Sequence, residues 1–202
     1  MTLPLKLIVG LGNPGEQYRE TRHNAGVWFV TRFAELHDAT FKEEKKFFGR
    51  MATAAVDGRE LRLLIPSTWM NESGRCVGIV ANFYKIAPEE ILIAHDELDL
   101  PIGIVRFKQG GGLAGHKGLR DIAAALGGSQ AFNRLRIGVG HPGHKSAVTG
   151  HVLGRASKQD KAVIDQCIDE ALRYMSLAIE GEWEHAMNRL NGFNAFEGEE
   201  DD

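Results

Sequence analysis

Residues 5–15 read Leu-Lys-Leu-Ile-Val-Gly-Leu-Gly-Asn-Pro-Gly, so a glycine-rich turn directly follows an apolar run. A short run of Leu, Ile and Val that ends in a turn predicts a buried strand over Leu5–Gly10. The turn also spells G-x-G-x-x-G, the pattern of dinucleotide-binding folds, in which a helix begins inside the turn and meets the pyrophosphate. Here Pro14 interrupts the turn, and the next helical period begins about a dozen residues later. The pattern therefore argues against a nucleotide-dependent oxidoreductase.

The remaining chain alternates strand and helix patterns without an internal repeat. Asp57-Gly58 separates two strand-like runs and predicts a hairpin turn. Further strands are expected over 47–56, 59–65, 91–94, 104–108 and 135–139. Helices are expected over 24–37, from about 72 to 84, over 116–126, from the Ser157 cap through an apolar stripe to 178, and over 183–190. Alternating elements with one hairpin predict an α/β fold: a single domain with a mixed, twisted β-sheet surrounded by helices.

Composition limits the class of protein. The chain has 202 residues, of which 43% are hydrophobic, enough for one sizeable core. We expect one domain over residues 1–196 and an acidic, disordered tail over 197–202. Cys76 and Cys167 lie in apolar-periodic segments and are expected to be buried free thiols. A basic leader and a membrane-spanning apolar run are both missing from the sequence, so a cytoplasmic protein without a membrane partner is expected.

Charge is unevenly distributed along the chain. The net charge is −3, yet residues 101–161 hold ten Lys or Arg and only two acidic residues. Four histidines lie in the same stretch, whereas the tail is acidic. Such asymmetry indicates a phosphate-binding surface on an otherwise acidic protein. The alternative, solvated charges scattered over several faces, stays open at this point.

Four polar residues lie where strands are expected to end or helices to begin: Asn13, His23, Asn71 and Asp96. An imidazole can activate water as a general base, and a carboxylate on its other nitrogen stabilises the imidazolium. Carboxamide N–H groups can hold a carbonyl oxygen as it becomes an oxyanion. We find no G-x-S-x-G nucleophile and no spacing typical of a metal site. Taken singly, residues of these types are more often caps or turn residues, so the hypothesis requires that they converge.

Six ordered blocks of sequence resemble those of bacterial peptidyl-tRNA hydrolases and cover residues ~5 to 155. They read V-G-L-G-N-P-G-E-Q-Y, T-R-H-N-A-G, T-W-M-N-E-S-G, H-D-E-L-D-L-P-I-G, F-K-Q-G-G-G-L-A-G-H-K-G-L and R-L-R-I-G-V-G-H-P-G. The resemblance implies hydrolysis of the ester between a peptide's C-terminal carboxyl and the ribose hydroxyl at the tRNA 3′ end. It further implies peptidyl-tRNA as partner, a monomer, and no metal or other cofactor.

The resemblance also assigns roles by matching positions. His23 would be the general base, Asp96 would hold and stabilise it, and Asn13 would distinguish N-blocked peptidyl-tRNA from free aminoacyl-tRNA. Met70 and Asn71 would line the peptide channel.

Other matching positions concern the tRNA. Tyr18 and Trp69 would contact its 3′ end, and Lys108 with Arg136 would bind phosphate. The segment near 150–161 would be a mobile lid.

One block departs from the family pattern. The segment G-H-K-G-L contains His116, which is expected to hold substrate, and Lys117. Lys117 lies at a position where the family usually has asparagine. A lysine donates to a carbonyl or phosphate but accepts nothing. His144 likewise replaces a more usual acidic residue. A second class stays open, an RNA-binding module without hydrolysis such as the plastid splicing-factor relatives, although a pure binder needs no base–carboxylate pair.

Overall fold

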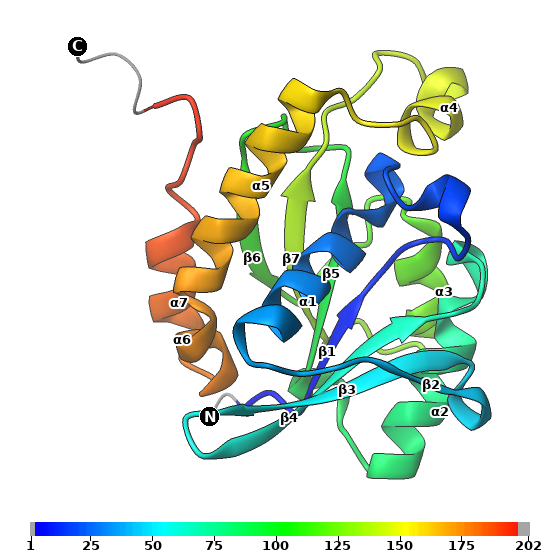
Figure 1. Ribbon diagram of the computed structural model, residues 1–202, viewed down its shortest axis with the longest axis vertical. Coiled ribbons are helices and arrows are strands. Elements are labelled where there is room, and N and C mark those ends of the chain that lie inside the picture. The colour runs from blue at the N-terminus through cyan, green and yellow to red at the C-terminus, as the bar shows by residue number, and fades with distance from the viewer. Residues whose placement is uncertain (1–2, 198–202) are drawn as a thin grey trace.

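Over residues 3–197, the part of the chain that the computed structural model describes, seven strands form one sheet (Figure 1). The strands are β1 (Leu7–Gly10), β2 (Lys42–Glu44), β3 (Gly49–Val56), β4 (Arg59–Pro66), β5 (Ile91–Glu97), β6 (Val105–Gln109) and β7 (Asn133–Gly138). Their order across the sheet is β2-β3-β4-β1-β5-β7-β6. The helices are α1 (Ala25–Leu36), α2 (Ser73–Tyr84), α3 (Lys117–Ala125), α4 (Val148–Val152), α5 (Lys158–Arg173), α6 (Met175–Ile179) and α7 (Trp183–Leu190).

The middle of the sheet is parallel and its edges are antiparallel. Strands β4, β1, β5 and β7 run in the same direction, whereas β2–β3, β3–β4 and β6–β7 are antiparallel pairs. The central strands β1 and β5 are buried along their whole length, which fits the apolar sequence of β1 and of the first four residues of β5, Ile91 to Ala94. This confirms the predicted class, an α/β fold with a mixed sheet and surrounding helices.

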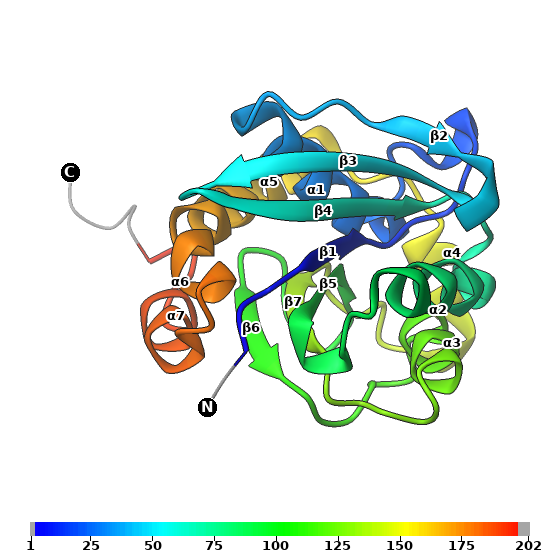
Figure 2. The ribbon, with the colours of Figure 1, turned by 90° about the horizontal axis from the view of Figure 1, so that it is seen from below.

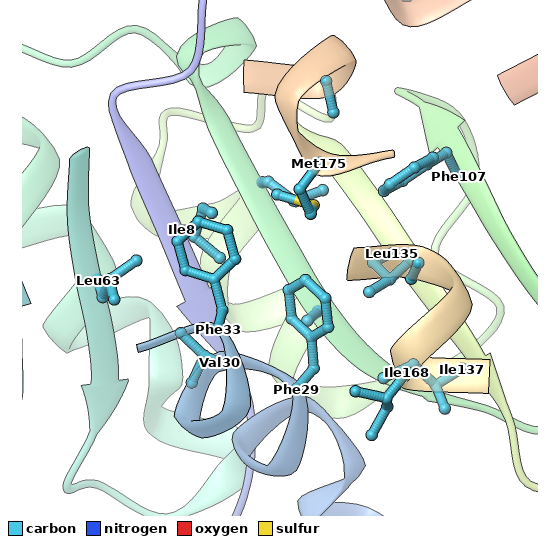
Figure 3. Packing of buried hydrophobic residues seen from close by; sticks show 14 of the residues in the cluster. Ile8, Phe29, Val30, Phe33, Leu63, Phe107, Leu135, Ile137, Ile168 and Met175 are labelled. Atoms are coloured by element: carbon cyan, nitrogen blue, oxygen red, sulfur yellow. The ribbon is translucent and has the colours of Figure 1, made fainter. Parts of the chain in front are cut away.

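Two apolar cores lie on opposite faces of the sheet. Helices α1, α5, α6 and α7 cover one face, where Phe29 and Phe33 pack over the sheet and Ile168 and Met175 close the same core (Figure 3). Helices α2 and α3 cover the other face (Figure 2). Cys76 and Cys167 are free and buried, as predicted. Burial raises the pKa of each thiol to about 12, with the Glu43 carboxylate contributing at Cys76.

Local sequence patterns predicted most of the elements. The predicted hairpin is confirmed, since Asp57 and Gly58 take φ angles of 48° and 77° between β3 and β4. The expected single helix from Ser157 to residue 178 is wrong, because the chain bends at Tyr174 into α5 and α6. The bend lets the backbone carbonyl of Ile179 accept from the Leu5 N–H at 2.9 Å, tying α6 to the residues before β1. Strand β2 was not predicted, since three charged residues carry no strand pattern.

No helix within residues 3–197 is long and apolar enough to cross a membrane. Of the acidic tail predicted over 197–202, only Glu197 belongs to the described residues, and 198–202 lie outside them.

Candidate active site

The glycine turn after β1 packs a helix against the sheet. A Cβ on Gly26, in the first turn of α1, would lie 2.1 Å from the carbonyl oxygen of Ala94. A Cβ on Gly10 would lie 2.5 Å from the carbonyl oxygen of Gly26. The start of α1 therefore touches the carboxyl end of β1 and the middle of β5, an approach that side chains at either position would block. The short 3-10 turn Arg22–Asn24 before α1 is thereby carried to the end of β5.

His23 and His116 both contact Asp96 at this edge of the sheet. His23 Nδ1 lies 2.9 Å from both carboxylate oxygens of Asp96, and His116 Nε2 lies 2.9 Å from Oδ1. The Asp96 side chain is 1% exposed. Burial disfavours its charged form, but the charges and hydrogen bonds of His23 and His116 outweigh burial and hold the pKa of Asp96 well below its usual range. A carboxylate that accepts from Nδ1 of His23 leaves Nε2 as the acceptor that faces outward.

Asn13 is held in one orientation by its neighbours. Its backbone N–H donates to Asn24 Oδ1 at 2.9 Å, and Asn24 Nδ2 donates to the Asn13 carbonyl at 3.1 Å. The side-chain oxygen of Asn13 accepts from the backbone N–H of Met70 at 2.8 Å. Because that bond occupies Oδ1, the Asn13 amide group offers its two N–H donors to a ligand.

A cleft of ≈ 340 Å³ lies at the carboxyl ends of the parallel strands, and residues of α4 line one side of it. Figure 1 shows α4 near these strand ends. Trp69 stands at its rim, 49% exposed, with the Tyr18 ring edge-on at 5.7 Å between centroids. Val152 of α4 and Leu153, the residue after this helix, form an apolar wall of the cleft. The cleft is lined by nine of the predicted site residues: Asn13, Tyr18, His23, Trp69, Met70, Asn71, Asp96, His116 and Lys117.

The two remaining predicted residues, Lys108 and Arg136, do not line the cleft. They lie on β6 and β7, where Lys108 is opposite Arg134 rather than Arg136. Arg106, Lys108, Arg134 and Arg136 all fall on one face of this strand pair, because directly opposed residues and residues two apart share a face. We call these four residues the cationic row. Arg136 Nε donates to Glu97 Oε2 at 3.0 Å, and Glu97 lines the cleft, so the row adjoins the site.

His95 is a feature that the sequence did not single out. Its ring is 1% exposed, its Nδ1 donates to the Asp96 carbonyl at 2.8 Å, and it lies edge-on to His116 with 5.0 Å between ring centroids. Burial, aided by the nearby His116, holds the pKa of His95 well below its usual value of 6.5. His95 therefore supports the ring of His116 as a neutral, packed side chain. Its position beside Asp96 on a strand gave no signal of this role.

The segment expected to form the lid, near 150–161, includes the last residues of α4 and the first turn of α5. Arg22, which directly precedes His23 in sequence, donates to the carbonyl of Arg155 at 3.2 Å and pairs with Asp160 at 3.0 Å. The lid segment is thus bonded to the turn that carries the predicted base, while its mobility stays a prediction.

Three side chains of the site could also ligate a metal ion, although the sequence predicted no such site. One atom each of His23, Asp96 and His116 lie within 4.8 Å of one another. Their nitrogen–oxygen separations of 2.9 Å are those of hydrogen bonds, so the histidine N–H groups already serve the carboxylate. The prediction of metal independence remains to be tested with a chelator.

Fold and site together define an α/β protein with a histidine–carboxylate pair in a cleft at the ends of parallel strands. Residues 7–198 match the sequence model of the peptidyl-tRNA hydrolase family, and the chain belongs to that family. It is 55% identical over 193 residues to the peptidyl-tRNA hydrolase of Edwardsiella ictaluri, covering 96% of this chain and 98% of that protein. It is 52% identical over 195 residues to that of Vibrio parahaemolyticus, covering 96% and 100%.

Solved structures agree with this assignment. The crystal structure of peptidyl-tRNA hydrolase from Acinetobacter baumannii superposes with a TM-score of 0.92 at 49% identity, covering 95% of this chain and 96% of that one. The resemblance read from the sequence blocks is therefore confirmed.

Proposed function

We propose that this chain hydrolyses the ester of peptidyl-tRNA with a water molecule that His23 activates. Membership of the peptidyl-tRNA hydrolase family supports the reaction. The observation that carries the mechanism is the contact of His23 Nδ1 with the buried Asp96 carboxylate at 2.9 Å in a cleft. That contact selects the tautomer in which Nε2 accepts a proton.

The reaction then proceeds in two proton transfers. His23 Nε2 takes a proton from water, and the resulting hydroxide attacks the ester carbonyl while Asp96 stabilises the imidazolium. An amide donor such as that of Asn71 holds the oxyanion of the tetrahedral intermediate. The imidazolium returns its proton to the ribose oxygen as the carbon–oxygen bond breaks, which yields a peptide carboxyl group and a free ribose hydroxyl.

Asn13 explains selectivity for an N-blocked substrate through the direction of its amide. Because its oxygen is occupied by the Met70 N–H, Asn13 presents N–H donors to the ligand. A peptidyl substrate offers an amide carbonyl that accepts from these donors. A free aminoacyl ester offers a charged ammonium group, which only donates and is repelled.

The tRNA end is expected to bind at the outer part of the site. Trp69 and Tyr18 at the rim offer aromatic surfaces to unstacked bases. Lys117, together with the partly exposed Arg106, Lys108 and Arg136 of the cationic row, offers positive charge for phosphates. In this proposal the protein acts as a monomer in the cytoplasm, and 1–196 is its catalytic domain.

The test compares N-acetyl-aminoacyl-tRNA with free aminoacyl-tRNA as substrates, in the presence of a chelator. We expect cleavage of the blocked substrate alone, and a loss of about 10³-fold or more in kcat for His23→Ala. His185→Ala, at an exposed histidine far from the cleft, is the matched control. Binding of tRNA without cleavage would favour the RNA-binding module instead. Loss of cleavage with the chelator would assign a metal to His23, Asp96 and His116.

A further inference from the structure

The turn that carries His23 is joined to the lid segment by backbone pairing. Thr21 and Arg155 form an antiparallel β-bridge. Beside this bridge, the Arg22 N–H donates to the Gly154 carbonyl at 3.2 Å. Figure 1 shows α4 next to the short turns that precede α1. We call this pairing of the two segments the lid joint.

The Arg22 side chain extends the lid joint to three acceptors. Its Nη1 donates to the carbonyl of Arg155 at 3.2 Å and to that of His151 at 3.4 Å. Its Nη2 donates to Asp160 Oδ2 at 3.0 Å, and the side chain is 14% exposed. A planar guanidinium fork can serve several acceptors in fixed directions, unlike the point charge of a lysine. Arg22 thereby holds together the end of α4, the loop after it and the first turn of α5.

The apolar wall of the cleft lies between two of these contacts. Val152 and Leu153 form that wall. The residues on either side of them, His151 and Gly154, are ones whose carbonyls accept from Arg22. The position of the wall is therefore coupled to the position of Arg22.

Three consecutive residues of one short turn contact three different parts of the site. Arg22 bonds the lid segment, and His23 Nδ1 contacts the buried Asp96 carboxylate at 2.9 Å. Asn24, which is 4% exposed, accepts from the Asn13 N–H and donates to the Asn13 carbonyl. The backbone has only two soft dihedral angles per residue, so a displacement at Arg22 is passed to its neighbour. The ring of the proposed base is therefore coupled to the wall of the cleft.

We infer that Arg22 is a positioning residue for the hydrolysis. It holds the turn of His23 against the lid segment, so that the position of the apolar wall sets the alignment of the base. The inference rests on the proposed function, in which His23 Nε2 takes a proton from water. Arg22 acts through His23, since its own side chain is not part of the cleft lining.

Alignment of the base and simple stabilisation by an ion pair predict different kinetics. A catalytic group that is misplaced by about 1 Å can lose about 10²-fold in rate. Loss of an ion pair that only stabilises the fold lowers the free energy of unfolding and leaves the kinetics of the folded protein unchanged.

The first experiment measures kcat, KM and urea unfolding for Arg22→Met, with N-acetyl-aminoacyl-tRNA as substrate. We expect kcat to fall about 10²-fold, because the base is no longer held in line. KM should stay within about threefold, because the lost interaction acts on the reacting state and not on substrate binding. Asp160→Asn weakens only one of the three contacts and is the milder variant, for which kcat should fall about fivefold at unchanged KM.

The matched control is Arg32→Met. It removes an arginine–aspartate pair, with Asp169 at 2.9 Å, that joins α1 to α5 outside the lid joint. This variant should retain the kcat of the unaltered protein.

A disulfide across the lid joint tests the same point by rescue. The two backbone hydrogen bonds of the bridge run between the neighbours of Thr21 and Arg155, at 3.2 Å each. Thr21 and Arg155 are thus a non-hydrogen-bonded pair, in which Cα atoms lie about 4.5 Å apart. That separation is within the range of disulfides. Thr21→Cys with Arg155→Cys can therefore close the joint without the guanidinium.

Rescue is measured in the Arg22→Met background, with the same cysteine pair in a protein that retains Arg22 as reference. Oxidation should restore kcat to within about tenfold of the reference, and reduction should remove the gain. Cys76 and Cys167 are buried and do not compete for the new bond.

The inference is overturned if Arg22→Met keeps its kcat and loses only free energy of unfolding, or if it raises KM alone. It is also overturned if a disulfide that mass spectrometry shows to be formed does not recover kcat, or if Arg32→Met lowers kcat as much. Should Arg22→Met fail to fold, Asp160→Asn with unchanged kcat would overturn it. Failure of the unaltered protein to cleave N-acetyl-aminoacyl-tRNA would instead refute the proposed function, so the two failures are distinguishable.

Discussion

Two glycine-bearing loops, 10–15 and 110–116, lead to the two histidines that contact Asp96, and they are held in different ways. In the first, Gly10 and Gly26 leave no room for a side chain, so packing against α1 and β5 determines the loop. In the second, a Cβ on Gly112 would meet nothing within 4 Å. The second loop is fixed by a few bonds instead, among them the one from buried Arg134 to the Gly110 carbonyl at 2.8 Å.

The side chains that the two loops bring to the cleft differ in the same way. Asn13 is oriented through Asn24 and Met70, whereas Lys117 is exposed and lies at the start of α3. The comparison teaches that the residue whose amide orientation matters lies on the tightly packed loop, while an exposed charge directly follows the open one. It also predicts that equal substitutions in the two loops will have unequal effects.

The largest effect is expected for Gly26→Ala. Its Cβ would lie 2.1 Å from the backbone oxygen of Ala94, which cannot move without displacing β5. We expect a loss of about 3 kcal/mol or more in the free energy of unfolding, at the upper end of overpacking effects. Urea unfolding measures it, and a loss under 1 kcal/mol would contradict the proposed rigidity of the first loop.

Asn13→Ala should lower kcat/KM for N-acetyl-aminoacyl-tRNA by about 10²–10³-fold, as for the loss of one oriented donor. Asn13→Asp is the matched variant, because it keeps the acceptor for the Met70 N–H and removes the donors. Similar losses in both variants would support the donor role. Full activity of Asn13→Asp would show that only the bond to Met70 matters.

A third prediction concerns how the free energy of unfolding depends on pH. It involves His95, which lies beneath His116, the last residue of the second loop. The folded state keeps His95 neutral because burial lowers its pKa, whereas the unfolded chain binds a proton below pH 6.5. Stability is therefore fully present above that pH and falls as the pH decreases, by up to about 1.4 kcal/mol per pH unit.

Unfolding titrations between about pH 6.5 and 4.5 measure this slope against His95→Asn, which retains a donor for the Asp96 carbonyl. The variant should lose the part of the slope that His95 causes. Exposed His185→Asn is the control and should keep it. An identical slope in all three proteins would contradict a neutral, buried His95.

Lys117→Asn should leave kcat/KM within about tenfold, since an exposed single charge contributes little. If Lys117 contacts a phosphate, the slope of log KM against log salt concentration should be smaller by about one in the variant. Kinetics at several salt concentrations separate the two quantities. Complete loss of activity would show that the lysine has become essential.

The smallest effect is expected for Gly112→Ala, the counterpart of Gly26→Ala in the open loop. With nothing within 4 Å of the new Cβ, the free energy of unfolding should change by no more than about 0.5 kcal/mol. Unfolding in urea provides the comparison. A large loss here would mean that the second loop is as tightly determined as the first.

Local sequence patterns predicted the elements well because the physics that places them is local. Periodicity located α1 and the buried strands, and Asp57-Gly58 located the hairpin. The bend at Tyr174 was not predicted, because the same apolar stripe continues through α5 and α6 and the contact of α6 with Leu5 is distant in sequence. Strand β2 was not predicted, because it is a strand through its pairing with β3 and not through the propensity of its own residues.

The candidate site was predicted as a set of residues, and nine of them line one cleft. The contact of His23 with Asp96 was expected from the resemblance, whereas the contact of His116 with the same carboxylate and the burial of His95 beside His116 were not predicted. So was the register that sets Lys108 opposite Arg134 instead of Arg136. These features join residues far apart in sequence, which no local pattern encodes.

By itself, the sequence determined the fold class, the absence of a helix within the glycine turn and the identity of the chemical groups. Tertiary structure alone decided which nitrogen of His23 faces the cleft and which way the Asn13 amide points. The reason is physical: propensity and periodicity act between neighbours along the chain, whereas tautomers, amide orientation and cavities depend on partners supplied by other strands and helices.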